Sequence, residues 1–284
     1  MPSTGPARRA IINADDFGMT PGISEGILRA HREGVATSTT MVMNFAEAAK
    51  WAARLGECPA LGVGIHLNAV QGAPLSKEGE ALVNAGGVME WKTPALARRC
   101  LLRPRLVRAI AAEYEAQIRL ALELGIRPTH LDSHRHLHAF TPVFRRVVRL
   151  GERYGIPFVR WPYERLPRGG WPESCARGRR TRWILNRFSR LNARLAARAH
   201  PTLGTWGIAH TGLIDAAWLI RAAAALRPGV TEIMTHPGVA DDACEHLTRL
   251  TMSRRRELEA LCDPDVRRAF TLNHVELIHY GHLR

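Results

Sequence analysis

The stretch THLDSHRHLH, residues 129–138, carries an acid-base side chain at every second position. These side chains are His130, Asp132, His134, His136 and His138. In an extended strand, residues two apart share one face, whereas on a helix the same residues scatter around the cylinder. We therefore predict that a strand presents them on one side. Histidine and aspartate in this arrangement can hold a metal ion or carry protons.

A second polar pair follows the apolar run AIIN, where Asp15 and Asp16 stand side by side. Neighbouring residues of a strand point in different directions, so the two carboxylates can take different roles. One can bind a cation while the other handles a proton. A plain turn before Phe17 and Gly18 is the structural alternative, although burying two unpaired carboxylates behind an apolar strand is costly.

His66 in GVGIHLN and His134 come at the ends of two further apolar runs. Imidazole together with carboxylate is a common ligand set for a catalytic divalent ion with open positions. Such an ion polarises a carbonyl and lowers the pKa of bound water from about 15.7 toward roughly 7, so that a nearby carboxylate can complete the deprotonation. The pattern predicts hydrolytic chemistry. Taken alone, His66 fits a buried core histidine equally well.

Gathering these residues requires a scaffold that brings strand ends together. β-like runs alternate with helix-like stretches along the chain, which indicates repeated βα units and a parallel sheet. With seven or eight mostly parallel strands, a closed or distorted (β/α) barrel is favoured over an open doubly wound sheet. No G-x-G-x-x-G follows the first strand, which argues against a nucleotide site. The β-like runs are RAIINADD, TTMVMN, LGVGIHLN, THLDSH, IPFVRWP, GTWGIAH, VTEIMTHPG and VELIHY.

In barrels of this kind the chemistry lies at the carboxyl ends of the strands. Polar residues stand at the ends of the predicted strands one after another along the sequence, which independent solvated residues would not do. They are Asp15, Asp16, Asn44, His66, Asn68, Asp132, His134, Arg160, His210 and His236.

Length and composition fit one α/β domain over residues 1–284, since 46% of the 284 residues are hydrophobic. An irregular basic insertion is expected at about residues 162–202. The five cysteines are widely separated and contain no C-x-x-C, which argues against a disulfide framework and against a cysteine zinc site. With no apolar run long enough for a signal or a membrane span, we expect a cytoplasmic protein.

The charge is strongly positive, with 40 Lys and Arg against 26 Asp and Glu. Such an excess fits a solvated surface, nucleic acid, an anionic membrane or a phosphorylated substrate. Within residues 177–200, apolar and arginine side chains separate on a helical wheel, as they do in helices that lie on anionic membranes. The alternatives are an ordinary amphipathic barrel helix or a lid. The apolar residues are Trp183, Ile184, Phe188, Leu191 and Leu195, and the arginines are Arg182, Arg187, Arg190, Arg194 and Arg198.

Several motifs together resemble the YdjC-like carbohydrate deacetylases of the ChbG and HpnK type. They are NADDFGMTPGISEGILRAHREGVATSTTMVMN, GIHLN with GAPLS, PTHLDSHRHLHAFTPVF, VRWPYE and MTHPG. The resemblance runs in order over almost the whole chain and is weakest from about residue 166 to residue 202. It implies a TIM-barrel-like fold and metal-dependent removal of an acetyl group from an N-acetylated sugar.

Carried across residue by residue, the resemblance makes His66, His134 and Asp16 the metal ligands and Asp15 the catalytic base. Similarity to the related polysaccharide deacetylases makes His236 the general acid and Arg160 the residue that orients Asp15. The family is described with magnesium, whereas two imidazoles and a carboxylate suit zinc or another transition ion. The identity of the metal therefore stays open.

The remaining polar residues are expected to support the ligands or contact substrate. Residues on one strand face are about 6.6 Å apart, so His134 binds the metal while His130 and Asp132 orient it. His136 and His138 are expected beyond the strand end, along the substrate cleft, or else as exposed loop histidines. Asn44 and Asn68 are assigned to substrate binding or to support of the ligands.

Other functions remain compatible with parts of the sequence. A barrel hydrolase of the amidohydrolase or phosphoesterase type also uses H-x-H, but on its first strand, which here carries Asp15 and Asp16. A nucleic-acid-binding protein is supported only by the arginine excess, so no nucleic-acid partner is expected. Chitooligosaccharides and hopanoid-linked or polyprenyl-linked acetylated sugars fit as substrates, and a homodimer and a peripheral membrane contact are compatible with the chain.

Overall fold

The strands form one curled parallel sheet in the computed structural model, which describes residues 7–167, 171, 174–196, 199–239 and 241–283. Seven strands follow the order β7-β6-β3-β2-β1-β9-β8, and β10 pairs with β1. Every pairing in this sheet is parallel. The strands are β1 (Arg8–Phe17), β2 (Ser38–Met41), β3 (Gly62–Leu67), β6 (His130–Ser133), β7 (Phe158–Val159), β8 (Thr205–Trp206), β9 (Gly229–Thr235) and β10 (Val275–Leu277).

All eight predicted strands are present, and the predicted TIM-barrel-like α/β fold is confirmed in a distorted form. The sheet curls into a half-barrel whose edges are β7 and β8. These two strands have two residues each, so their ladders are short. At this opening the loop after β7 meets β8, because the main-chain N–H of Thr205 donates to the carbonyl of Tyr163 at 3.0 Å.

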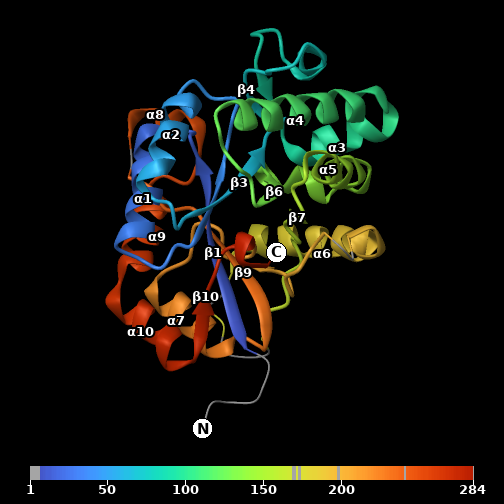
Figure 1. The fold of residues 1–284 in the computed structure, drawn as a ribbon. Coiled ribbons are helices and arrows are strands. Elements are labelled where there is room, and N and C mark those ends of the chain that lie inside the picture. The colour runs from blue at the N-terminus through green and yellow to red at the C-terminus, as the bar shows by residue number, and fades with distance from the viewer. Residues whose placement is uncertain (1–6, 168–170, 172–173, 197–198, 240, 284) are drawn as a thin grey trace.

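Helices pack around the sheet, as Figure 1 shows. Thr20 caps the first helix, with its hydroxyl accepting from the N–H of Ile23 at 3.2 Å, and Pro21 occupies the first turn. The α-helices are α1 (Pro21–Arg32), α2 (Ala48–Arg54), α3 (Thr93–Leu102), α4 (Arg105–Glu123), α5 (Thr141–Tyr154), α6 (Ala176–Ala196), α7 (Ala216–Ala225), α8 (Asp242–Leu247), α9 (Met252–Cys262) and α10 (Pro264–Leu272). The 3-10 helices are η1 (Leu55–Glu57), η2 (Glu78–Leu82), η3 (His134–Ala139) and η4 (Tyr280–Leu283).

Two large apolar clusters hold the helices to the sheet. One joins β3 and β6 to α4 and α5 and includes Ile65, Tyr114 and Phe144. The other joins β1 and β9 to α7, α9 and α10 and includes Trp218 and Phe270. Burying one large side chain of this kind contributes about 1.5 to 3 kcal/mol. The two clusters therefore fix the strands on both sides of β1, whose end carries the two aspartates.

A two-stranded antiparallel hairpin, β4 (Gln71–Gly72) and β5 (Met89–Glu90), was not predicted from the sequence. It follows β3 and is found at the top of the view in Figure 1. Strands of two residues leave too short a pattern for alternation to be recognised.

Within the predicted basic insertion, residues 162–167 have no regular structure and α6 covers most of the basic stretch. Arg198, one of the arginines of the predicted wheel, lies outside the described residues. Among the helices that the structure describes, none combines the length and the apolar character needed to cross a membrane.

Candidate active site

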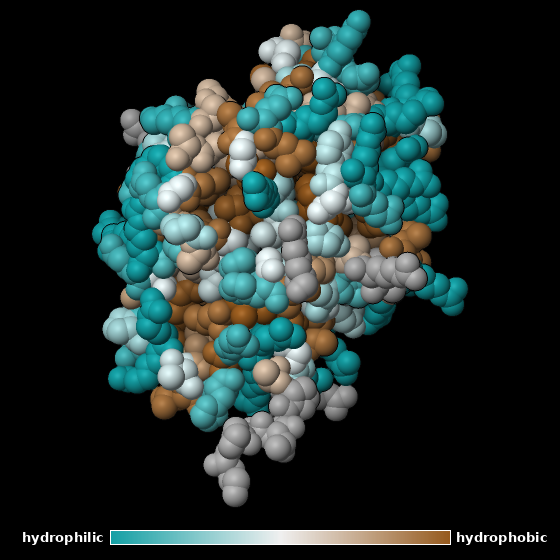
Figure 2. Space-filling model, in the orientation of Figure 1, coloured by the Kyte–Doolittle hydropathy of each residue, from teal (hydrophilic) through white to brown (hydrophobic). Residues whose placement is uncertain are grey.

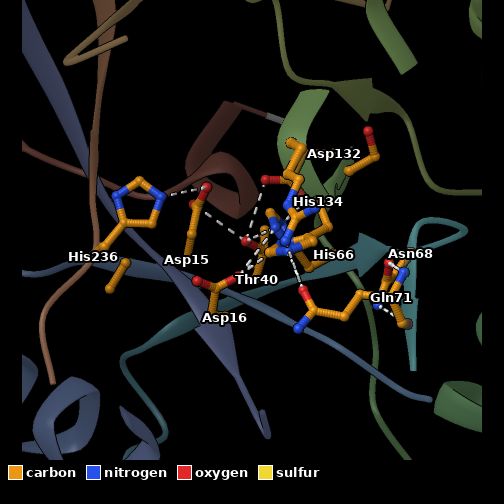
Figure 3. Close-up of polar contacts among 12 residues, drawn as sticks. Asp15, Asp16, Thr40, His66, Asn68, Gln71, Asp132, His134 and His236 are labelled. Carbon is orange, nitrogen blue, oxygen red and sulfur yellow. Dashed lines mark hydrogen bonds and ion pairs between the residues drawn. The ribbon is translucent and has the colours of Figure 1, made fainter. Parts of the chain in front are cut away.

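Asp15 and Asp16 lie near the end of β1 and are both buried, but their side chains diverge (Figure 3). The cause is local, because Asp16 has a φ of 78°, in the left-handed region that residues other than glycine rarely adopt. The register between β1 and β2 shifts at the same place, between Ala14 and Phe17. Asp16 consequently faces His66 and His134, while Asp15 faces His236 (Figure 3).

The ring of His66 is oriented by Asp132. Its Nδ1–H donates to Oδ1 of Asp132 at 2.7 Å, which points Nε2 at Oδ1 of Asp16, 3.4 Å away. A carboxylate that fixes the far nitrogen of a histidine is the usual partner of a metal-binding imidazole.

The ring of His134 is oriented by Gln71, which contacts Nε2, the ring nitrogen that does not face Asp16. Arg135 donates to Oε1 of Gln71 at 3.0 Å, and Nε2 of Gln71 donates to the carbonyl of Leu247 at 2.6 Å, so the amide has one orientation. Its Oε1 therefore accepts from Nε2–H of His134 at 3.3 Å. The lone pair of His134 Nδ1 then faces Oδ1 of Asp16 at 3.1 Å.

Two imidazole nitrogens thus converge on one carboxylate oxygen, an arrangement that suits a cation between them. The ligand atoms of Asp16, His66 and His134 all lie within 4.8 Å of one another. Burial lowers the pKa of His66, but the carboxylates of Asp132, Asp15 and Asp16 outweigh it and raise that pKa to about 9, which shows how strongly the cluster attracts positive charge. The residues fit a divalent ion with three protein ligands and open positions.

Asp15 is held by a buried arginine. Nη1 and Nη2 of Arg160 donate to the two carboxylate oxygens of Asp15 at 2.7 and 2.6 Å. The same guanidinium lies 2.6 Å from Asp132 and donates through Nε to Glu232 at 2.8 Å, so it joins three carboxylates. Burial raises the pKa of Asp15, but Arg160 outweighs it and holds this pKa well below its usual range. Asp15 is therefore an ionised carboxylate with one fixed orientation.

His236 directly follows β9, and its Nε2 lies 4.0 Å from Oδ2 of Asp15. Its main-chain N–H donates to Oε2 of Glu257 at 2.6 Å. Burial lowers the pKa of His236 to about 4, although the charge of Asp15 acts in the opposite direction. The imidazole is therefore neutral in the resting site.

The sequence of the chain matches the family described as YdjC-like protein over residues 9–271. The chain belongs to the YdjC-like family. A carbohydrate deacetylase of Oceanobacillus iheyensis is 28% identical over 256 residues, which cover 89% of this chain and 96% of that relative. A chitooligosaccharide deacetylase of Salmonella typhimurium is 40% identical over 150 residues, covering 52% of this chain and 58% of the relative.

A solved structure of a protein from Enterococcus faecalis superposes on this YdjC-like chain with a TM-score of 0.78. The two chains are 23% identical, and the superposition covers 98% of this chain and 99% of the other. At this level of identity the likeness supports the fold.

Asn44 and Asn68 of this YdjC-like protein hold the hairpin that carries Gln71. Asn44 donates to the carbonyl of Gln71 at 2.9 Å, and Asn68 donates to the same carbonyl at 2.8 Å. Asn68 also donates to Oδ1 of Asn44 at 3.0 Å. Their contacts therefore support Gln71, and through it the ring of His134.

The predicted alternation from His130 to His138 ends early, because β6 stops at Ser133. Arg135 and His136 have φ values of 53° and 54°, which turn the chain into η3. Contrary to the prediction that it lines the cleft, His138 is fully buried, with Nδ1 2.7 Å from the Ser133 hydroxyl and Nε2 3.2 Å from the carbonyl of Arg160. His136 is partly exposed.

His130 also differs from its predicted role of orienting His134. Its ring stacks on Tyr280 with the centroids 4.0 Å apart, and Nδ1 lies 3.0 Å from the hydroxyl of Thr129. Tyr280 in turn donates to Glu232 at 2.9 Å. His130 therefore belongs to the packing beneath the Arg160 network, and Asp132 is the residue that orients a ligand, on His66 and not on His134.

Several residues of the YdjC-like site were not predicted from the sequence. Gln71 lies in the unpredicted hairpin, and Thr40 on β2 places its hydroxyl 3.3 Å from Asp15 and 3.2 Å from Asp132. Arg254 on α9 is 1% exposed and lies 2.5 Å from Oδ2 of Asp16. Arg254 stands in the run SRRREL, where nothing in the local pattern separates it from its solvated neighbours. Thr40 could have been inferred from its position one strand away from Asp15.

Proposed function

We infer that this chain, a carbohydrate deacetylase, is a metal-dependent hydrolase that removes the N-acetyl group of an acetylated amino sugar. The observation that carries the inference is the convergence of His66 Nε2 and His134 Nδ1 on one oxygen of Asp16. A fixed carboxylate, Asp15, and a third imidazole, His236, lie next to these ligands at the ends of β1 and β9 (Figure 3).

Asp16, His66 and His134 would hold the metal. The chemistry supplied by a divalent ion held there would be polarisation of the acetamide carbonyl and a lower pKa of bound water. Magnesium is the ion expected from the family resemblance, whereas a ligand set with two imidazoles also suits zinc and other transition ions.

Asp15 is assigned as the base that takes a proton from the attacking water. Its two oxygens are both bonded to Arg160, so the carboxylate cannot rotate away from the site. The same guanidinium lowers the basicity of Asp15, so its contribution is position more than proton affinity. Arg160 thus acts as a positioning residue for the base.

His236 is assigned as the acid that protonates the departing amine. Because this imidazole is neutral at rest, it must gain a proton before it can act as an acid. The donor is Asp15, which lies 4.0 Å away and is protonated once it has acted as the base. A proton taken from water by Asp15 can therefore pass to His236 and from there to the amine nitrogen. Acetate and the free amino sugar are the products, and both residues end in their starting states.

Acetate release from a panel of N-acetylated oligosaccharides and glycolipids tests this function. We expect release that a chelator abolishes and that magnesium, zinc, manganese or cobalt restores. Release that survives complete metal removal would contradict the proposed metal dependence. Hydrolysis of phosphate esters without any acetate release would instead support the phosphoesterase alternative. Comparing oligosaccharides with glycolipids in the same panel decides which form of acetylated sugar is the substrate.

A further inference from the structure

The outer face of α6 and the segment Tyr163–Leu166 form a surface that the proposed mechanism does not use. A pocket of about 580 Å³ lies between them. Four arginines and two aromatic rings line much of it, namely Arg165, Arg182, Arg187, Arg190, Tyr163 and Trp183. We call these six residues together with Leu191, Arg194 and Leu195 the α6 surface.

The arginines of this pocket make no close ion pair within the described part of the chain, although Arg182 is near enough to Glu164 for its charge to lower the pKa of that carboxyl. None of Arg165, Arg182, Arg187 and Arg190 forms an ion pair with a described carboxylate, and the guanidinium of Arg190 lies 5.9 Å from the ring centre of Tyr163. The carboxylate among the lining residues is Glu164, and its oxygens are turned into the fold. They accept from the N–H groups of Gly207 and Ala209 at 2.8 and 2.9 Å. The pocket therefore presents uncompensated positive charge to solvent.

Large apolar side chains lie among these charges. Trp183 is 68% exposed, Leu191 60% and Leu195 41%. At 100° per residue these three side chains fall within about 120° of arc on α6, and Arg187, Arg190 and Arg194 project from the same side. In Figure 2, brown side chains meet teal ones at the right edge of the molecule, where Figure 1 places α6.

The opposite face of α6 is anchored to the fold by hydrogen bonds. Asn186 bonds both the N–H and the carbonyl of Glu164, at 2.8 and 2.9 Å, and Ser189 donates to the carbonyl of Pro162 at 3.0 Å. Asn192 donates to the carbonyl of Ala139 at 2.8 Å. Phe188, which the helical wheel placed on the membrane side, packs edge-on against Phe140. Because the inner face of α6 is bonded to the fold, the exposed tryptophan and leucines on its outer face remain directed toward solvent.

We propose that the α6 surface binds the headgroup layer of an anionic phospholipid membrane. Guanidinium groups bind phosphate oxygens through paired hydrogen bonds, and tryptophan is favoured at the boundary between water and lipid. A soluble phosphate would account for the arginines but not for the exposed leucines beside them. A nucleic-acid backbone would likewise leave Leu191 and Leu195 without a partner.

Two short stretches of chain connect α6 and its pocket to the candidate active site. Ala139, which Asn192 holds, is the last residue of η3, and the first residue of η3 is His134. Tyr163 comes three residues after Arg160, so their backbones are at most about 11 Å apart. An enzyme docked through α6 is therefore suited to an acetylated sugar presented by a lipid. This statement about substrate rests on the proposed function, whereas the membrane contact itself does not.

Sedimentation of the whole protein with vesicles tests the contact. We expect binding to vesicles of phosphatidylglycerol and phosphatidylcholine, and none to phosphatidylcholine alone. The triple variant R187Q/R190Q/R194Q should lower the bound-to-free ratio by about tenfold or more. The matched control R29Q/R255Q/R268Q removes the same charge from exposed arginines that have acidic partners, and it should change binding little. W183S/L191S should weaken binding without any change in charge.

Several results would overturn the proposal. Negligible binding to both kinds of vesicle would show that the protein does not bind membranes. An equal loss of vesicle binding in the two triple variants would show that the α6 surface has no specific part in it. Displacement by pyrophosphate together with unchanged binding of W183S/L191S would assign the pocket to a soluble anion, and tighter binding of single-stranded RNA would assign it to nucleic acid.

Acetate release from a soluble N-acetylated oligosaccharide, measured without vesicles, separates this proposal from the proposed function. The triple variant R187Q/R190Q/R194Q should retain wild-type activity in that assay. Loss of this activity would place the arginines in catalysis or folding instead of membrane binding. A wild-type protein that binds vesicles but releases no acetate would contradict the deacetylase mechanism and leave the membrane contact standing.

Discussion

Arginines occur in two contrasting settings in this protein. Arg160 in the candidate active site is fully buried and contacts three carboxylates, those of Asp15, Asp132 and Glu232. Arg187 and Arg190 on the α6 surface are exposed and have no acidic partner among the described residues. A buried guanidinium whose donors are all used can only hold its neighbours in place. An exposed guanidinium without a partner is free to bind something from outside the fold.

The two settings also differ in what a substitution costs. Removing one member of a buried ion pair leaves an uncompensated charge and destabilises a protein by about 3 to 5 kcal/mol. Exposed ion pairs contribute about 0 to 1 kcal/mol, and an exposed arginine without a partner contributes less still to folding. The candidate site should therefore respond to mutation through structure and chemistry, and the α6 surface through binding alone.

The largest effect is expected for the two neighbouring aspartates, which the proposed mechanism separates by role. Asp15→Asn should abolish acetate release while metal content stays near that of the wild type, because the base is lost and the ligands remain. Asp16→Asn should lose the metal as well, and asparagine tolerates the positive φ at this position. Metal analysis of both purified variants beside their activity is the measurement. Substantial turnover by Asp15→Asn would show that another group is the base.

The second largest effect is expected for His236, the proposed general acid. A positioned general acid contributes about 10²- to 10⁴-fold to the rate, so His236→Ala should lower kcat by that order and leave metal content unchanged. Steady-state kinetics with a soluble substrate measure this. If only KM changes, His236 binds substrate and the acid must be sought elsewhere.

The contrast between the arginines can be tested directly through stability. Arg160→Gln should lower the free energy of unfolding by about 3 to 5 kcal/mol, since three buried carboxylates lose their counter-charge. Arg187→Gln, with the same chemical change on α6, should alter it by less than about 0.5 kcal/mol. Urea titration of both variants gives the comparison. Equal stabilities would mean that the buried network contributes nothing to folding.

The free energy of unfolding should depend on pH through Glu164, the buried carboxylate beside the α6 pocket. Burial raises the pKa of Glu164 to about 7, above its value of about 4.3 in an unfolded chain. The folded state therefore binds a proton that the unfolded state releases between these values. The stability contribution is complete below about pH 4.3 and is lost as pH rises through 7, by about 4 kcal/mol. Urea midpoints at pH 5 and pH 8 should differ less in Glu164→Gln than in the wild type. An identical pH dependence would show that Glu164 does not titrate in this range.

The smallest effect expected is that of Gln71. Partners that orient a ligating histidine typically contribute 10- to 100-fold to metal affinity, so Gln71→Ala should weaken metal binding by about that factor. Gln71→Glu keeps an oxygen that can accept from Nε2–H of His134 and should restore most of the affinity. Calorimetric metal titration of the metal-free variants, without substrate, is the measurement. If Gln71→Ala binds the metal as tightly as the wild type, the hydrogen bond from His134 to Gln71 does not contribute to metal affinity.

Much of the fold was predictable because each strand has its own local pattern. β-like runs between helix-like stretches located the eight strands of the sheet. The rule that parallel strands place chemistry at their carboxyl ends put Asp15, Asp16, His66 and His134 among ten candidate residues before any contact was known. The edge strands β7 and β8 were recognised as strands, but nothing in IPFVRWP or GTWGIAH shows that the sheet stays open between them. That property depends on the path of the chain between the two strands.

The supporting residues of the site were not predictable for a different physical reason. Gln71 and Arg254 reach the ligands from a hairpin and from a helix far away in sequence, so their burial is decided by tertiary packing. The alternation at His134, His136 and His138 was misleading, because Arg135 and His136 adopt positive φ without glycine. Tertiary contacts of η3, such as the bond from Asn192 to Ala139, accompany this turn and leave no sign in the local sequence.

The stacking of His130 on Tyr280 affects how this protein can be shortened or tagged. Tyr280 lies in η4, just beyond β10, and β10 pairs with the first residues of β1. Cutting the chain after Asn273 would remove β10 and Tyr280 together. Among the described residues, the side-chain partners left to Glu232 would be Arg160 and Thr205. The segment Val275–Leu283 therefore helps to hold the candidate active site from beneath. A purification tag joined beyond it needs a flexible spacer so that η4 can still pack against His130.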